Sequence, residues 1–243
     1  MDGKEHYRRY GHKSRARLKK WKKENLEYHK EQQRKYRAEN AEKRRTDEKL
    51  RRESLKLEIL EHYGKKCVCC GESITEFLCI DHIDEGGNKQ RKKIGGGTAF
   101  QRWIKKNNFP SNFRILCHNC NACVCAHRKC IHKNGVTAPF IERNPRYEYM
   151  KQLRRNVRKQ VLSQYSITDP PSCACCGEKE FEFLCLDHIN GGGKKHRQQV
   201  GRGSTFYRWV VDNKYPSGFR VLCYNCNFAI GNGNICPHRL TIP

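Results

Sequence analysis

The chain has 243 residues, with 50 lysines and arginines against 25 acids, and its formal net charge is +25. Such an excess favours nucleic acid as the partner, because each phosphate contact releases condensed counterions. No stretch has the roughly 20 apolar residues of a membrane span, and no apolar signal segment follows the charged start. We therefore expect a cytoplasmic protein with no membrane partner and no small-molecule substrate.

Residues 1–49 are predicted to form a basic helical arm that binds nucleic acid. The first 60 residues carry 21 lysines and arginines against 11 acids, and no glycine or proline occurs between Gly11 and Gly64. The segment is rich in good helix formers, but its apolar residues are too sparse for a coiled-coil seam. One or two solvated helices are expected; a disordered basic tail is the alternative.

An internal repeat organises the remainder of the chain. A shift of 106 positions aligns residues 67–132 with residues 173–238 without a gap, and 33 of the 66 aligned positions are identical. A match of this length indicates a duplicated domain. We predict a first zinc module at residues 50–132, a connector at 133–152 and a second module at 153–243, each module beginning with an amphipathic helix.

Two Cys-x-x-Cys pairs occur in each repeat, with 46 residues between the pairs. One such turn places two thiolates at neighbouring corners of a tetrahedron, so two turns complete a closed four-thiolate zinc site. Disulfides or a redox pair are the alternative. The predicted ligands of two structural Zn²⁺ ions are Cys67, Cys70, Cys117 and Cys120 in the first repeat and Cys173, Cys176, Cys223 and Cys226 in the second.

Other cysteines recur between the repeats with less obvious roles. Cys69 lies within the first Cys-x-x-Cys turn, and Cys79 lies on a predicted strand. We expect these cysteines, and their counterparts in the second repeat, to be buried and to pack as small apolar side chains. Two interpretations of the repeated Cys-x-His pair stay open: it caps the terminal helix, or it joins a middle cysteine in a second metal site. The pairs are Cys130 with His132 and Cys236 with His238.

Between the zinc pairs, each repeat has a predicted strand that ends in Asp-His. Successive side chains on a strand face opposite sides, but the glycines that follow indicate that the strand ends there, which would free both groups. A basic, glycine-rich loop is expected next, suited to phosphate, and then a short helix, a second strand and a final helix. The candidate phosphate-binding residues are Lys89, Arg91, Lys194, Lys195, His196, Arg197 and Arg202.

This order of motifs resembles the HNH (His-Me finger, ββα-metal) endonucleases, in particular the zinc-braced, phage recombination endonuclease VII-like proteins and phage and bacterial HNH proteins with a basic helical N-terminus. The resemblance covers both repeats and, loosely, the arm. It implies an α+β fold with two tandem ββα-metal domains, a DNA-cutting activity and a phage-like origin. It also implies that His82 and His188 are general bases, and that Mg²⁺ or Mn²⁺ is bound by Asp81 with Asn121 and by Asp187 with Asn227.

The chemistry of the residues agrees with that implication. A histidine with a pKa of about 6.5 can act as a base at neutral pH, and hard oxygen ligands suit magnesium or manganese. Copy one has Asp84-Glu85 where copy two has Asn190-Gly191, and Gln90 where copy two has His196. The second repeat is therefore expected to be the stronger site.

We expect a phosphodiester hydrolase that acts on duplex or branched DNA. Two sites on one chain would let a monomeric pseudo-dimer cut both strands. The alternative is a non-catalytic, zinc-containing DNA- or RNA-binding protein, which would not need an Asp-His pair and an asparagine in both repeats. A purely structural interaction protein would leave both the charge and the histidines unexplained.

Overall fold

The computed structural model describes residues 15–84, 87–127, 129–132, 135–139, 142–231 and 235–240. The chain divides into two compact units, Met1–Ser54 and Leu55–Pro243, and both repeats lie in the second unit. Positions 1–14 of the predicted arm and the acid Glu85 lie outside the described residues.

The described part of the first unit is helical, as predicted. Residues 15–24 form one helix, α2 spans Leu26–Glu39, and α3 begins within this unit and spans Ala41–His62. No residue from 15 to 54 is buried. Exposed ion pairs one turn apart, such as Lys35 with Glu31 at 3.0 Å, add only modest support. Helix propensity, rather than a core, accounts for these helices.

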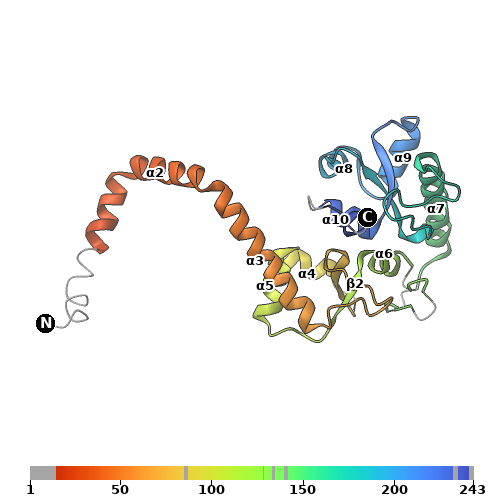
Figure 1. The fold of residues 1–243 in the computed structure, drawn as a ribbon, viewed down its shortest axis with the longest axis horizontal. Coiled ribbons are helices and arrows are strands. Elements are labelled where there is room, and N and C mark those ends of the chain that lie inside the picture. Colours follow the sequence, from red (N-terminus) through yellow and green to blue (C-terminus); the bar gives the residue numbers. More distant parts are fainter. Residues whose placement is uncertain are drawn as a thin grey trace. The chain divides into compact units, whose positions relative to one another are not determined.

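The two repeats contain the same elements in the same order, except that the second ends in an additional short helix, and the α+β class is confirmed (Figure 1). After α3, the first repeat has η1 (Thr75–Phe77), β1 (Leu78–His82), α4 (Gly87–Ile94), α5 (Thr98–Lys106), β2 (Phe113–Cys117) and α6 (His118–His127). The second repeat has α7 (Pro145–Tyr165), η2 (Phe181–Phe183), β3 (Leu184–His188), α8 (Gly193–Val200), α9 (Ser204–Asp212), β4 (Phe219–Cys223), α10 (Tyr224–Gly231) and α11 (Pro237–Leu240). Helix α7 thus begins inside the segment predicted as the connector.

Each repeat has a two-stranded antiparallel sheet, and the two sheets have the same register. Strand β1 pairs with β2 so that Asp81 lies opposite Arg114. Strand β3 pairs with β4 so that Asp187 lies opposite Arg220. Because a one-residue slip would move every side chain to the other face, this common register places equivalent residues of the two repeats in equivalent positions.

The expected basic loop after each Asp-His pair is instead a helix, α4 or α8, so that prediction was wrong. Lysine, glutamine and arginine, which fill these segments, are good helix formers. The glycines lie at the ends, where the backbone leaves the helical conformation: Gly192 before α8 has φ 77°, and Gly95 and Gly201, after α4 and α8, have φ 85° and 98°. Glycine adopts these angles without steric cost. The cationic side chains are therefore carried on ordered helices.

The long helix of each repeat packs its C-terminal end on the sheet. Ile59 and Leu60 of α3 are buried, as are Val161 and Leu162 of α7. In both repeats a tyrosine at or just after the helix end donates a 2.6 Å hydrogen bond to a proline carbonyl: Tyr63 to Pro110, and Tyr165 to Pro216. The two tyrosines therefore mark equivalent positions in the repeats.

A reciprocal interface joins the two repeats. The backbone N–H of Asn119 donates to Asn225 Oδ1 at 3.0 Å, and the N–H of Asn225 donates to Asn119 Oδ1 at 2.9 Å. Both asparagines are buried. Each side chain thus satisfies a donor in the first turn of the other repeat's helix, α6 or α10, where backbone N–H groups lack partners within the helix. His118 stacks on Phe228 beside them.

The repeats also exchange phenylalanines. Phe77 of the first repeat belongs to the apolar core of the second, and Phe183 of the second belongs to the core of the first. Phe77 packs on His238, and Phe183 packs on His132. This two-fold exchange buries a large aromatic side chain on each side, which is the main stabilising contribution of such a contact.

Candidate functional site

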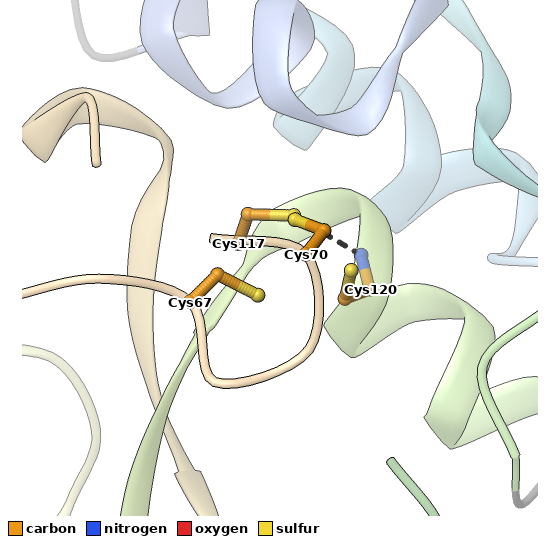
Figure 2. A group of neighbouring side chains, drawn as sticks. All are labelled: Cys67, Cys70, Cys117 and Cys120. Atoms are coloured by element: carbon orange, nitrogen blue, oxygen red, sulfur yellow. Dashed lines mark hydrogen bonds between the residues drawn. The ribbon is translucent and has the colours of Figure 1, made fainter. Parts of the chain in front are cut away.

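Four cysteines converge in each repeat where the Cys-x-x-Cys turn meets the second strand and the following helix (Figure 2). Cys67 and Cys70 come from the turn, Cys117 ends β2, and Cys120 lies in the first turn of α6. All four sulfur atoms lie within 4.8 Å of one another. The second repeat has the same arrangement, formed by Cys173, Cys176, Cys223 and Cys226.

The geometry of these clusters fits zinc and not disulfides. Sulfur atoms about 2.3 Å from a tetrahedral zinc ion lie about 3.8 Å apart. Cys70 Sγ lies 3.9 Å from Cys117 Sγ, and Cys176 Sγ lies 3.8 Å from Cys223 Sγ, whereas a disulfide needs about 2.05 Å. All sixteen cysteines are free. The predicted four-cysteine clusters are thus assembled and could hold zinc ions.

The thiols of each cluster shift one another's pKa in opposite directions: in the first repeat the pKa values of Cys67 and Cys70 are lowered, whereas those of Cys117 and Cys120 are raised. Cys120 N–H points to Cys117 Sγ at 3.4 Å, and Cys226 N–H to Cys223 Sγ at the same distance. Hydrogen bonds from Cys117, Cys120 and Cys70 hold the pKa of Cys67 far below its usual range. Thiolates are the form that binds zinc.

A second group of metal-ligand atoms adjoins each four-cysteine cluster. In the first repeat, Cys69, Cys120, Cys130 and His132 place their ligand atoms within 4.8 Å of one another. In the second, the equivalent group is Cys175, Cys226, Cys236 and His238. The sequence alone did not decide whether the Cys-x-His pair caps the terminal helix or contributes to a second metal site. It gave no sign that one cysteine would belong to both groups.

Both strand-end histidines are held by aromatic rings. His82 stacks on Phe100, with 5.3 Å between ring centroids, and His188 stacks on Phe206 at 5.5 Å. His188 Nε2 lies 2.9 Å from His196 Nδ1 of α8. In the first repeat Gln90 replaces this histidine, and its Oε1 accepts from His82 Nε2. The lone pair of His82 then lies on Nδ1.

Glycine lets α4 and α8 begin close over the histidine rings. A Cβ on Gly193 would lie 2.7 Å from His188 Nδ1, and a Cβ on Gly87 would lie 3.0 Å from His82 Nδ1. Real Cβ atoms essentially never approach a heavy atom as closely as 2.7 Å. The backbone of each helix therefore lies directly against the imidazole.

Burial lowers the pKa of His188, and the nearby His196 and Arg197 lower it further against the opposing effect of Asp187. A neutral imidazole retains the lone pair that proton abstraction needs. The environment of His188 thus favours the form that can act as a base at neutral pH.

The aspartates project to the opposite face of the sheet from the histidines, where each forms an ion pair. Arg114 Nε donates to Asp81 Oδ2 at 2.8 Å, and Arg220 Nε donates to Asp187 Oδ2 at 2.9 Å. Strands β1 and β3 do end at the histidine, as expected, but the aspartate before it carries a guanidinium partner. The sequence offered no signal for this pairing, because it depends on the register between the strands.

The two asparagines differ in their contacts. Asn227 Nδ2 donates to Cys185 Sγ at 3.0 Å, which places Asn227 on the same face of the sheet as Asp187. In the first repeat, Asn121 Oδ1 accepts from Cys125 Sγ at 3.6 Å. The contact of Asn121 thus involves the oxygen that would bind a hard cation, and the contact of Asn227 involves the amide nitrogen.

The candidate phosphate-binding residues gather on or directly after α4 and α8, the helices that cover the histidines. His196 and Arg197 are half-buried against His188. The remaining side chains are exposed, as expected for groups that meet a polyanion: Lys89, Arg91, Lys194, Lys195 and Arg202.

Comparison with protein-family models, curated proteins and solved structures finds no match for this chain. Among the described residues, no helix combines the length and the apolar character needed to cross a bilayer. The groups available in these sites are clustered cysteine sulfurs that could bind metal and an imidazole beside a cationic helix.

Proposed function

We propose that this protein is a metal-dependent endonuclease that hydrolyses DNA phosphodiester bonds. The observation that carries the proposal is the repeated strand end: in both repeats a histidine, packed on a phenylalanine, lies under a helix that carries exposed cations. A binding protein has no need to place an imidazole at this point twice.

Phosphodiester hydrolysis requires an activated water and neutralisation of charge on the phosphate. His82 and His188 would accept the proton of the water. Exposed cations of α4 and α8 would hold the phosphate. The zinc clusters would brace the fold, because four thiolates leave no coordination position for substrate.

Asp187 and Asn227 are the proposed ligands of a divalent cation in the second repeat, and Asp81 and Asn121 in the first. Their oxygen atoms are hard donors of the kind that Mg²⁺ and Mn²⁺ prefer. Such an ion, when bound, would stabilise the negative charge that develops on the phosphate. Arg220 is paired with Asp187, so the cation would bind beside this guanidinium or displace it from the carboxylate.

The second repeat is proposed as the more active site. Its asparagine contacts Cys185 through nitrogen rather than oxygen, and its His188 has a second imidazole as neighbour. In the first repeat, the Asn121 oxygen accepts from a thiol. The first repeat would therefore cut more slowly, or mainly position DNA.

A non-catalytic, zinc-containing DNA- or RNA-binding protein is the second candidate. The ion pairs Asp81–Arg114 and Asp187–Arg220 favour it, because they engage both carboxylates that the nuclease mechanism needs. The net charge of +25 suits either function.

Cleavage of supercoiled plasmid with Mg²⁺ tests the proposal. We expect the wild type to linearise plasmid, His82→Ala and His188→Ala to leave mainly nicked circles, and the double variant to be inactive. His188→Ala should cause the larger loss in rate. His62→Ala, at an exposed position outside the predicted arm and the proposed sites, is the control, and zinc content is measured for every variant.

Two results would contradict the nuclease. A wild type that shifts plasmid on a gel but never cuts it would make this a binding protein. A double histidine variant that still cuts, with its zinc retained, would place the chemistry elsewhere or in a contaminant.

A further inference from the structure

The two groups of metal ligands in each repeat share one cysteine. Cys120 belongs both to the four-cysteine cluster and to the group of three cysteines and one histidine. Cys226 has the same double membership in the second repeat. Both shared cysteines are fully buried. A thiolate has several lone pairs, so one sulfur atom can bind two metal ions.

The distances within the mixed group fit a tetrahedral metal ion. With zinc bonds of about 2.3 Å to sulfur and 2.0–2.1 Å to nitrogen, a sulfur and a nitrogen ligand lie about 3.6 Å apart. His132 Nδ1 lies 3.5 Å from Cys69 Sγ, 3.6 Å from Cys120 Sγ and 3.2 Å from Cys130 Sγ. The histidine thus sits at one corner, with sulfur at the other three.

The second repeat reproduces this geometry with different surrounding residues. His238 Nδ1 lies 3.2 Å from Cys226 Sγ and 3.7 Å from Cys236 Sγ. Between the shared cysteine and the Cys-x-His pair, residues 122–129 differ from residues 228–235 at every aligned position. The Cys-x-His pair nevertheless returns in register in both copies. A helix cap would not need both residue types to recur after a wholly altered segment, whereas a metal site would.

We infer that each repeat holds a binuclear zinc centre in which Cys120, or Cys226, bridges the two ions. Without the shared sulfur, the mixed group would have only three ligands, and the coordination shell of the second ion would stay open. With it, both shells close, using six thiolates and one imidazole per repeat. The chain would therefore bind four zinc ions, twice the number predicted from the Cys-x-x-Cys pairs.

The second ion of each centre would also tie the two repeats together. His132 packs on Phe183, and His238 packs on Phe77, each phenylalanine coming from the other repeat. Metal ligation fixes the orientation of an imidazole. The rings that receive the exchanged phenylalanines would thus be held in place by zinc, and this inference does not depend on the nuclease activity.

Zinc stoichiometry of the full-length protein tests the centre. We expect native mass spectrometry and elemental analysis to give four zinc ions per chain for the wild type. Two ions per chain, even after reconstitution with excess zinc, would overturn the inference. The measurement needs no substitution and no activity, so its failure is distinguishable from failure of the proposed function.

X-ray absorption on the zinc-loaded protein tests the bridge itself. Two tetrahedral ions that share a sulfur lie about 3.5–3.8 Å apart, given Zn–S bonds of about 2.3 Å and an angle of about 100–110° at the sulfur. We expect a zinc–zinc scattering path near that distance. Four ions per chain without this path would mean separate sites, and would overturn the bridge.

Substitution then assigns the second ion to the mixed group. Cys69→Ser combined with Cys175→Ser should lower the count from four ions to two, and should remove the zinc–zinc path. Cys79→Ser is the matched control, since Cys79 belongs to neither group. Retention of four ions and of the path in the double variant would contradict the assignment.

Discussion

At the scale of single residues, the environment of the strand-end histidines is set by backbone that approaches very closely. Gly193 begins α8 against the ring of His188, and Gly87 begins α4 against His82. A Cβ at position 193 would overlap the ring of His188, and a Cβ at position 87 would make a tight contact with the ring of His82.

Gly193→Ala should therefore displace His188. The new methyl group would meet His188 Nδ1 at 2.7 Å, and relief of such overpacking typically costs about 1–3 kcal/mol. We expect a lower melting temperature and, if His188 is the base, a fall in cleavage rate of about tenfold or more.

The matched control is Gly231→Ala in α10. No described residue has an atom within 4 Å of its Cβ position, and Gly231 is the last residue of the helix, so alanine should leave cleavage unchanged and change stability by less than about 0.5 kcal/mol. If Gly193→Ala behaved like Gly231→Ala, the close packing of α8 on His188 would be wrong.

At the scale of elements, the first turns of α6 and α10 depend on each other. Each helix offers a backbone N–H to an asparagine of the other repeat, and both asparagines are buried. One first-turn N–H of each helix is thus capped by an asparagine of the opposite repeat, and another by the sulfur of the cysteine that precedes the helix.

Asn119→Ala and Asn225→Ala should destabilise the protein by similar amounts. Each substitution removes the acceptor for one buried N–H, at a cost of about 1–2 kcal/mol. Urea unfolding measures this loss. Asn213→Ala, at an exposed helix end where the side chain bonds within its own helix, should change stability by less than about 0.5 kcal/mol. Equal effects of buried and exposed substitutions would argue against the reciprocal contact.

At the scale of the whole molecule, a buried carboxylate joins the repeats. Glu182 of η2 contacts His127 of α6 at 2.7 Å and also binds Arg155 and Arg158 of α7. Burial acts to raise the pKa of Glu182, but Arg155, His127 and Arg158 outweigh it, and the pKa is lowered. The ionised form is thus stabilised by folding.

Glu182→Gln should destabilise the protein by about 1–3 kcal/mol at pH 7, because it leaves the partly buried guanidinium of Arg158 without its buried counter-charge. A lowered folded-state pKa contributes stability that is present above the unfolded pKa of about 4.3 and is lost as the pH falls through the folded value. Urea titrations from pH 7 to pH 3 should therefore show the wild type approaching the variant. Glu148→Gln, at an exposed acid, is the control. A difference that is constant with pH would contradict the network.

The sequence by itself determined the repeat, the α+β class, the Cys-x-x-Cys clusters and the strands that end in Asp-His. These features can be recognised from spacing along the sequence: two residues between cysteines, a short apolar strand that ends in Asp-His, and a fixed shift between copies. Cys67 and Cys117 could be assigned to one site from sequence because each repeat has two such pairs, and two pairs supply the four thiolates of a tetrahedral zinc site.

Only the tertiary structure decided the remainder. Three features join residues that are distant along the chain. Cys120 belongs to two ligand groups, Asp81 pairs with Arg114, and the repeats exchange Phe77 and Phe183. Such contacts depend on strand register and on how two folded repeats meet, and neither is encoded in the spacing of a single segment. The helices α4 and α8 could be predicted only in part. Their sequences contain good helix formers, but the neighbouring glycines led to the prediction of a loop, and only the structure shows that these glycines lie at the helix ends.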